Sequence, residues 1–185
     1  MGIGGQQVTI VVDVANVMGS RPDGWWRDRA GAAVRLHAEI VRLARTGRAI
    51  VPPSPALDGP ALGEQVPGEQ APDEQVPGEQ APDEPRLTPG WVMVLEGAAR
   101  AAAARLTAAE PGADDGRTGP VQPVQPGEVR VVQARGSGDD TIVVVARDLP
   151  GRRVVVTADR GLRARCVAVG AEILGPGWLL GLLRG

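Results

Sequence analysis

The sequence predicts an α/β fold in which helices cover both faces of a mostly parallel sheet of four to five strands, a three-layer α/β/α sandwich. Two observations predict it. Short apolar runs alternate along the chain with segments of helical periodicity, which is the rhythm of β-α-β units. The first run, VTIVVDV at residues 8–14, is apolar almost throughout, as a strand buried on both faces must be.

The remaining elements are expected in the order that this rhythm gives. Segment 27–46 carries apolar residues at helical spacing and is followed by Gly47, a typical helix stop. Segment 176–184 begins with a proline, which is common in the first turn of a helix. Further helices are expected at 97–109, 139–147 and 160–169, and further strands at 91–95, 129–134, 154–158 and 171–174.

Length and composition narrow the class of protein. The 185 residues suit a single domain spanning 1–185. One cysteine excludes an internal disulfide, which favours a reducing compartment, and a cytoplasmic location is expected. No apolar run approaches the roughly 18 residues of a membrane helix, and the first residues do not resemble a signal peptide, so no membrane partner is expected.

Two stretches are expected to lie outside the folded core. Residues 64–73 and 74–83 carry the same decapeptide, EQVPGEQAPD, which has no large apolar side chain to offset the entropy of ordering. We therefore interpret residues 52–85 as a disordered acidic insert. Residues 108–127 are rich in Pro, Gly, Gln and Asp and are interpreted as a long flexible loop.

The acidic insert hides the charge of the remaining chain. The whole sequence has a formal net charge of −2, but residues 64–84 contain seven acids and no base. The rest of the chain has 20 arginines against 15 acids, a net charge of +5. A basic fold suits a polyanionic substrate. The insert either competes with that polyanion or is a solvated spacer, and the spacer is the simpler interpretation.

Acidic residues stand at the ends of four of the expected strands. Asp13 ends the first strand, and Glu96 directly follows the second. Asp139 and Asp140 open the helix after the third strand, and Asp159 follows the fourth. Because the carboxyl ends of parallel strands form the edge where open α/β sheets hold ligands, these carboxylates are expected to converge.

Such a cluster needs a compensating positive charge. Carboxylates about 6 Å apart repel by roughly 2.8 kcal/mol per pair at an effective dielectric constant of 20. Protonation or a bound cation offsets this repulsion, and oxygen ligands without His or Cys favour Mg²⁺ or Mn²⁺. A metal of this kind supports phosphodiester hydrolysis. The sequence has no G-x-x-x-x-G-K-[ST] loop and no G-x-G-x-x-G after the first strand, which argues against the common nucleotide-binding folds.

Each of these residues also has a simpler structural explanation. Asp159, and either Asp139 or Asp140, could be a helix N-cap. Asn16 could cap a turn, and Glu96 could be a first-turn acid favoured by the helix dipole. The placement of all the acids at one expected edge favours the metal site over separate caps.

The segments VVDVANVMGS, VMVLEG, GSGDDTIV and VVVTADRGLR resemble, in this order, the PIN-like NYN nucleases, and are most similar to the YacP-type branch. The resemblance covers nearly all of the chain outside the insert. It implies a PIN-like sheet and cleavage of RNA, with Mg²⁺ or Mn²⁺ as cofactor. It implies metal or catalytic roles for Asp13, Asp159 and Asp140 or Asp139, with Asn16 supporting Asp13. Glu96 stands where relatives often carry Asp. Relatives of this kind often pair, so a homodimer is one expectation.

Residues 19–29, GSRPDGWWRDR, follow the Asp13 end of the sheet. Their arginines could contact phosphates, and a tryptophan could stack on an unpaired base. Alternatively, one tryptophan packs the first helix on the sheet while the arginines pair with Asp23 and Asp28. The candidate substrate-binding residues are Arg21, Trp25, Trp26, Arg27, Arg135, Ser137 and Arg160.

Three functional hypotheses follow. The first is a metal-dependent ribonuclease that acts on single-stranded RNA through the carboxylate cluster. The second is an RNA-binding module that kept the fold without hydrolysis. The third is a nucleotide phosphohydrolase or pyrophosphohydrolase that uses the same metal site.

Overall fold

The computed structural model describes residues 7–47, 49, 51–52, 88–107 and 122–184. The chain divides into two units, residues 1–50 with 86–185 and residues 51–85. All helices and strands of the described residues belong to the first unit. The predicted insert, apart from Pro52, lies outside the described residues, as do residues 108–121 of the predicted loop. None of the described helices is both long and apolar enough to cross a membrane.

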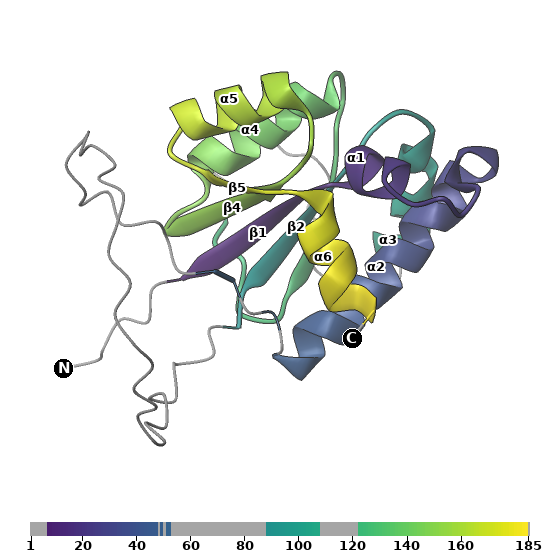
Figure 1. Cartoon of the computed structure of the whole chain (residues 1–185), viewed down its shortest axis with the longest axis horizontal. Helices are drawn as coiled ribbons and strands as arrows, with labels where there is room; N and C mark the ends of the chain where they lie inside the picture. Colours follow the sequence, from purple (N-terminus) through teal and green to yellow (C-terminus); the bar gives the residue numbers. More distant parts are fainter. Residues whose placement is uncertain (1–6, 48, 50, 53–87, 108–121, 185) are drawn as a thin grey trace, which may run out of the picture. The chain divides into compact units, whose positions relative to one another are not determined.

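The first unit is built on a five-stranded sheet in which every neighbouring pair of strands is parallel (Figure 1). The strands lie side by side in the order β3-β2-β1-β4-β5. Their bounds are Val8–Asp13 for β1, Gly90–Leu95 for β2, Val129–Gln133 for β3, Arg152–Val156 for β4 and Glu172–Leu174 for β5. The prediction of an α/β fold with a parallel sheet is confirmed.

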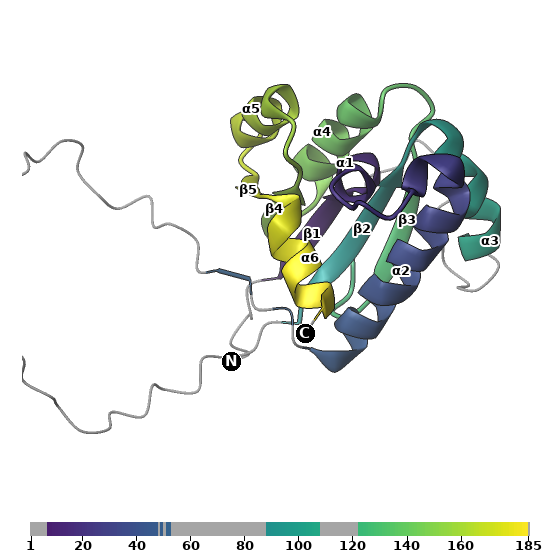
Figure 2. The same ribbon diagram turned by 45° about the vertical axis from the view of Figure 1, so that its right-hand side comes forward.

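Helices cover both faces of this sheet, which makes the three layers of the predicted sandwich (Figure 2). Helices α2 (Arg29–Thr46) and α6 (Pro176–Arg184) pack together on one face. Helices α4 (Gly138–Asp148) and α5 (Arg160–Ala168) pack together on the other. The 3₁₀ helix η2 (Gly97–Ala102) and the short helix α3 (Ala103–Thr107) lie against α2.

The strands divide their side chains between the two layers of helices. Val11, Val92 and Val155 belong to one buried cluster with Ile142 of α4 and Leu162 of α5. Because successive residues of a strand point to opposite faces, the residues directly before and after each of these valines in its strand face the α2 side. Both sets are almost completely buried, as the continuous apolar runs of the sequence predict.

The structure differs from the sequence prediction in three features, besides shifts of one or two residues in the bounds of other elements, such as β4, which was predicted at 154–158 and spans Arg152–Val156. The first strand ends at Asp13, one residue early, because the Asp13 side chain caps a short helix, α1 (Val14–Gly19). The segment expected as one helix over 97–109 begins instead as the 3₁₀ helix η2, with Gly97 at a φ of 52°, before α3. A third feature absent from the prediction is the 3₁₀ helix η1 (Trp25–Arg27).

The order of the strands creates a crevice between β1 and β4. The chain leaves β1 through α1 and α2 on one face of the sheet, whereas it leaves β4 through α5 on the other. Neighbouring parallel strands whose connections diverge in this way leave an opening at their carboxyl ends, where α/β proteins commonly bind ligands. Asp13 lies at the carboxyl end of β1.

Candidate active site at the carboxyl edge of the sheet

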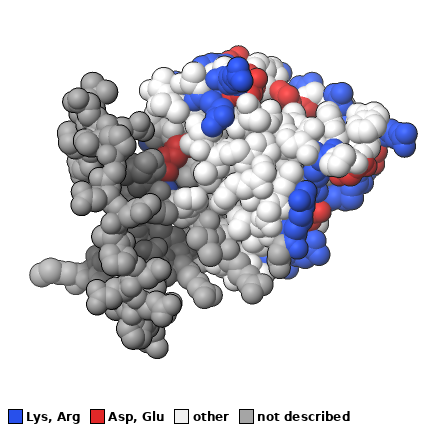
Figure 3. All heavy atoms as spheres, in the orientation of Figure 1, with Lys and Arg blue, Asp and Glu red and all other residues white. Residues whose placement is uncertain are grey.

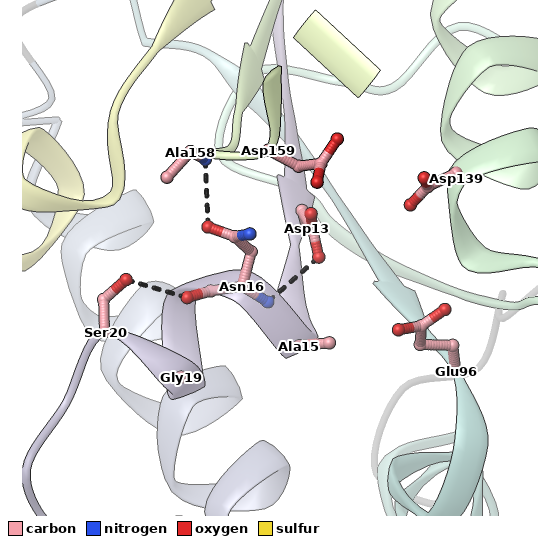
Figure 4. Close-up of a pocket in the computed structure, with 9 residues that line it drawn as sticks. All are labelled: Asp13, Ala15, Asn16, Gly19, Ser20, Glu96, Asp139, Ala158 and Asp159. Atoms are coloured by element: carbon pink, nitrogen blue, oxygen red, sulfur yellow. Dashed lines mark hydrogen bonds between the residues drawn. The ribbon is translucent and has the colours of Figure 1, made fainter. Parts of the chain in front are cut away.

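A pocket of about 540 Å³ opens at this edge of the sheet (Figure 4). Four of its lining residues are acidic and come from four separate segments of the chain. Their carboxylates point toward a common space in Figure 4, with Asp13 and Asp159 side by side and Glu96 and Asp139 across from them. The residues that line the pocket are Asp13, Ala15, Asn16, Gly19, Ser20, Glu96, Asp139, Ala158 and Asp159.

Asp13 is the buried member of this group, with 6% of its surface exposed. Its Oδ1 accepts a hydrogen bond from the backbone N–H of Asn16 at 3.0 Å, and its Oδ2 accepts one from the Thr157 hydroxyl at 2.9 Å. Burial raises the pKa of Asp13 above 3.8, and the charges of Glu96 and Asp139 raise it further. The two hydrogen bonds lower this pKa, but the effect of burial is larger.

Thr157 links Asp13 to Asp159 and was missed in the sequence analysis. Its Oγ1 donates to Asp13 and accepts from the backbone N–H of Asp159 at 3.2 Å. The side chain of Asn16 makes a parallel link, since its Oδ1 accepts from the N–H of Ala158 at 2.9 Å. The position of Thr157 follows from the pairing of β1 with β4. Val12 pairs with Val156, so Thr157, the residue after Val156, lies beside Asp13.

Glu96 is held by the first residue of helix α4. Its Oε2 accepts a hydrogen bond from the N–H of Gly138 at 2.9 Å. A Cβ atom on Gly138 would lie 2.1 Å from that oxygen, so the contact requires glycine. Glu96 thus ties the end of β2 to the start of α4 while it lines the pocket.

The two neighbouring acids of α4 have different surroundings. Asp139 lines the pocket and, within the described part of the chain, makes no hydrogen bond or ion pair. Asp140 is exposed, forms an ion pair with Arg165 of α5 and does not line the pocket. The predicted cluster therefore forms with Asp139, and the expectation that Asp140 shares it is not met. Ser137 caps α4, so neither aspartate is the cap of that helix.

The other two aspartates of the pocket, Asp13 and Asp159, each cap a helix as well as line the pocket. Asp13 caps α1, and Asp159 caps α5 by accepting from the N–H of Leu162 at 2.7 Å. The N-cap explanation for Asp159 is therefore correct, yet the same carboxylate lines the common pocket. The two explanations are compatible, because helices that follow parallel strands begin at the edge where the pocket lies.

The predicted substrate-binding residues do not line the pocket, and most are solvent-facing. Arg21 forms an ion pair with Glu39, which directs it to α2. Trp26 is the most exposed of the tryptophans, and Arg27 is also exposed. Arg135 and Arg160 are exposed at the same edge of the sheet, after β3 and at the start of α5, and Ser137 is exposed beside Asp139.

The donor atoms of the pocket suit a hard cation, because they are carboxylate oxygens without His or Cys. Among the described residues, however, no three side chains of the His, Cys, Asp and Glu types are placed to hold one metal ion together. Mg²⁺ commonly takes only one or two protein carboxylates and keeps several waters. The pocket fits that mode of binding better than a site with three direct protein ligands.

Comparison of the chain with models of protein families, with curated proteins and with solved structures found no match.

Proposed function

We propose that the protein is a divalent-metal-dependent ribonuclease that hydrolyses RNA phosphodiester bonds in this pocket. One observation carries the proposal. Four carboxylates from the ends of β1 and β2 and the starts of α4 and α5 line one pocket, at the edge where such sheets bind ligands. The motif resemblance to PIN-like NYN nucleases supports the same reaction class.

Capping alone does not account for this set of acids. Asp139 has no hydrogen bond or ion pair within the described part of the chain, although it lines the pocket beside other acids. The pKa of buried Asp13 is raised partly by Asp139 and Glu96, so the acids repel one another across the pocket. A protein keeps an arrangement that disfavours folding chiefly where a ligand or a reaction uses it.

Mg²⁺ or Mn²⁺ fits this set of oxygen donors, and Asp13 and Asp159 would hold it, with Glu96 and Asp139 acting through water. When bound, such an ion polarises a phosphate and lowers the pKa of a coordinated water. Thr157 and Asn16 hold the Asp13 carboxylate and the chain before Asp159 in place. In this proposal Glu96, fixed by Gly138, and Asp139 would orient a water and accept its proton.

The test is cleavage of a labelled single-stranded RNA with Mg²⁺ or Mn²⁺ by the wild type, Asp139→Asn and Asp140→Asn. The two aspartates are neighbours on one helix, but only Asp139 lines the pocket. We expect at least a 10-fold loss of activity for Asp139→Asn and less than a two-fold change for Asp140→Asn, on the scale typical of groups that orient metal-site ligands, about 10–100-fold.

Equal activity of the wild type and Asp139→Asn would overturn this assignment of the site. RNA binding without any metal-dependent cleavage would favour the RNA-binding module instead. Nucleoside triphosphates, assayed beside the RNA, separate the nuclease from the nucleotide phosphohydrolase, because only the latter turns them over faster than the RNA.

A further inference from the structure

Two adjacent tryptophans, half-buried Trp25 and exposed Trp26, lie close to the acidic pocket. Gly19 and Ser20 line the pocket, and the ring of Trp25 lies 3.7 Å from the position that a Cβ on Gly19 would take. The next residue, Trp26, has 57% of its surface exposed, which is unusual for a large apolar side chain in this structure. Trp25 therefore packs beside a residue that lines the pocket, and Trp26, the next residue of η1, presents an open surface next to it.

Trp25 is fixed by its neighbours and in turn supports Trp26. The backbone N–H of Trp25 donates to Asp23 Oδ1 at 3.1 Å, and the Arg29 guanidinium lies 5.2 Å from the centre of the Trp25 ring. The two indoles meet edge to face, with centroids 6.4 Å apart and planes at 87°. Trp25 thus holds Trp26 in place while leaving most of the Trp26 surface open to solvent.

Arg27 and Arg29 do not pair with Asp23 and Asp28, which was the alternative expected from the sequence. Asp23 accepts from the Trp25 N–H, and Asp28 caps α2 through the N–H of Gly31 at 2.8 Å. Arg27 and Arg29 are exposed and, in the ranges that the structure describes, form no ion pair. Arg27 directly follows Trp26, and Arg29 lies over the Trp25 ring, so two arginines without an ion pair to any described residue accompany the open aromatic surface.

We propose that Trp26 stacks on an unpaired base of an RNA strand, while Arg27 and Arg29 contact the phosphates of that strand. This inference rests on the proposed function, because it places a neighbouring phosphate of the same strand in the pocket. Aromatic side chains and cations are the two components from which single-strand binding sites are built. Bases within a duplex are already stacked on both faces, so this surface selects single-stranded RNA over duplex RNA.

The test measures binding with no turnover, so that it does not depend on catalysis. The full chain is titrated, in the presence of EDTA, into a fluorescently labelled single-stranded RNA, the matching duplex and the same strand with abasic sites. The variants are Trp26→Ala, Trp26→Phe and Val167→Ala. Val167 lies on α5 and is 59% exposed, so its truncation is a matched control for the loss of exposed apolar surface.

We expect Trp26→Ala to weaken single-strand binding by about 10-fold, in the range for the loss of one stacked base. Trp26→Phe should keep most of the affinity, and Val167→Ala should change it less than two-fold. The loss caused by Trp26→Ala should disappear on the abasic strand. Equal affinity of the wild type and Trp26→Ala, or a loss as large on the duplex or the abasic strand, would overturn the inference.

The outcomes separate this inference from the proposed function. Metal-dependent cleavage that fails in Asp139→Asn, together with unchanged binding by Trp26→Ala, would retain the nuclease and remove the stacking surface. Binding that depends on Trp26, without any cleavage by the wild type, would retain the stacking surface and remove the nuclease.

Discussion

Asp13 is the residue at which folding and the proposed chemistry oppose each other. Its carboxylate is buried beside two other acids, and its pKa is raised by that burial and by their charges. Ionised Asp13 therefore disfavours folding, although the ionised form is the one that would hold a cation. Functional sites commonly retain such a conflict, and removing it stabilises the fold while abolishing activity.

We predict that Asp13→Asn raises the free energy of unfolding by about 1 kcal/mol at neutral pH and lowers RNA cleavage by at least about 100-fold. The amide keeps an oxygen that can accept from the Asn16 N–H, and it removes the buried charge. Chemical denaturation and single-turnover cleavage measure the two effects. A destabilised Asp13→Asn protein would contradict this account of the charge.

The pH dependence of this gain follows from the direction of the pKa shift. Because folding raises the pKa of Asp13, the folded state binds the proton more tightly than the unfolded state does. The wild type therefore loses stability relative to Asp13→Asn as the pH rises above 3.8, and the difference levels off above the raised pKa. Unfolding free energies of both proteins, measured across this pH range, give the difference directly. The contributions of the other titratable groups are common to both proteins and cancel.

At the scale of elements, the site depends on helices that begin where strands end. The carboxylate of Asp159 caps α5, and Glu96 joins the end of β2 to the first residue of α4. Each contact holds a helix start at the sheet edge and fixes a carboxylate of the pocket at the same time. Capping and proposed chemistry must therefore be separated by substitutions that keep one and remove the other.

Asp159→Ser and Asp159→Ala make this separation at α5. Serine can still accept from the Leu162 N–H, so we expect the stability to stay within a few tenths of a kcal/mol, whereas alanine costs about 1 kcal/mol. Both remove the carboxylate, and both should lower RNA cleavage by at least about 10-fold. Thermal unfolding and cleavage assays are the measurements. Full activity in the serine variant would show that Asp159 is a cap and nothing more.

Gly138→Ala tests the position of Glu96 without removing any charge. The new Cβ would lie 2.1 Å from Glu96 Oε2, so the carboxylate must move away from its hydrogen bond with α4. We expect only a small loss of stability, because the displaced atoms are mainly the end of a flexible side chain, and a loss of cleavage of about 10–100-fold.

Gly136→Ala is the matched control for this variant, because a Cβ at Gly136 meets nothing within 4 Å. It should change neither stability nor cleavage appreciably. Equal activity of the two alanine variants would mean that Glu96 does not have to hold its place for the reaction.

At the scale of the whole molecule, charge is unevenly divided along the chain. Basic side chains gather along α2 and around α5 in Figure 3, with acidic ones interspersed. The two decapeptides at 64–83 carry six acids and no base, while the formal net charge of the chain is only −2. For the proposed RNA substrate, long-range attraction would depend on this total as well as on local contacts.

Replacing the six acids of residues 64–83 by their amides takes the formal net charge from −2 to +4. We expect several-fold tighter RNA binding at low salt and no difference at high salt, because the Debye length is about 10 Å at 0.1 M and shrinks with ionic strength. Fluorescence anisotropy of labelled RNA, titrated at a series of salt concentrations, measures this change in affinity. A variant with the same residues in scrambled order should bind like the wild type, and a gain that persists at high salt would contradict a long-range effect.

The sequence by itself determined the class of fold, the order of the strands along the chain and the acids that follow them. These properties are local, because apolar runs, helical periodicity and caps depend on neighbouring residues. It did not predict α1, which the Asp13 side chain caps by accepting from the Asn16 N–H, or the 3₁₀ helix that begins at Gly97. Both depend on backbone geometry that the pattern of apolar residues does not encode.

Only the tertiary structure decided which side chains of the candidate site meet. Adjacent helical residues point about 100° apart, so the rotation of α4 against the sheet selects Asp139 for the pocket and Asp140 for Arg165. The contacts of Thr157 with Asp13 and of Glu96 with Gly138 join residues far apart in the chain. Strand register and helix docking fix such contacts, and these follow from packing of the whole core, which no local segment specifies.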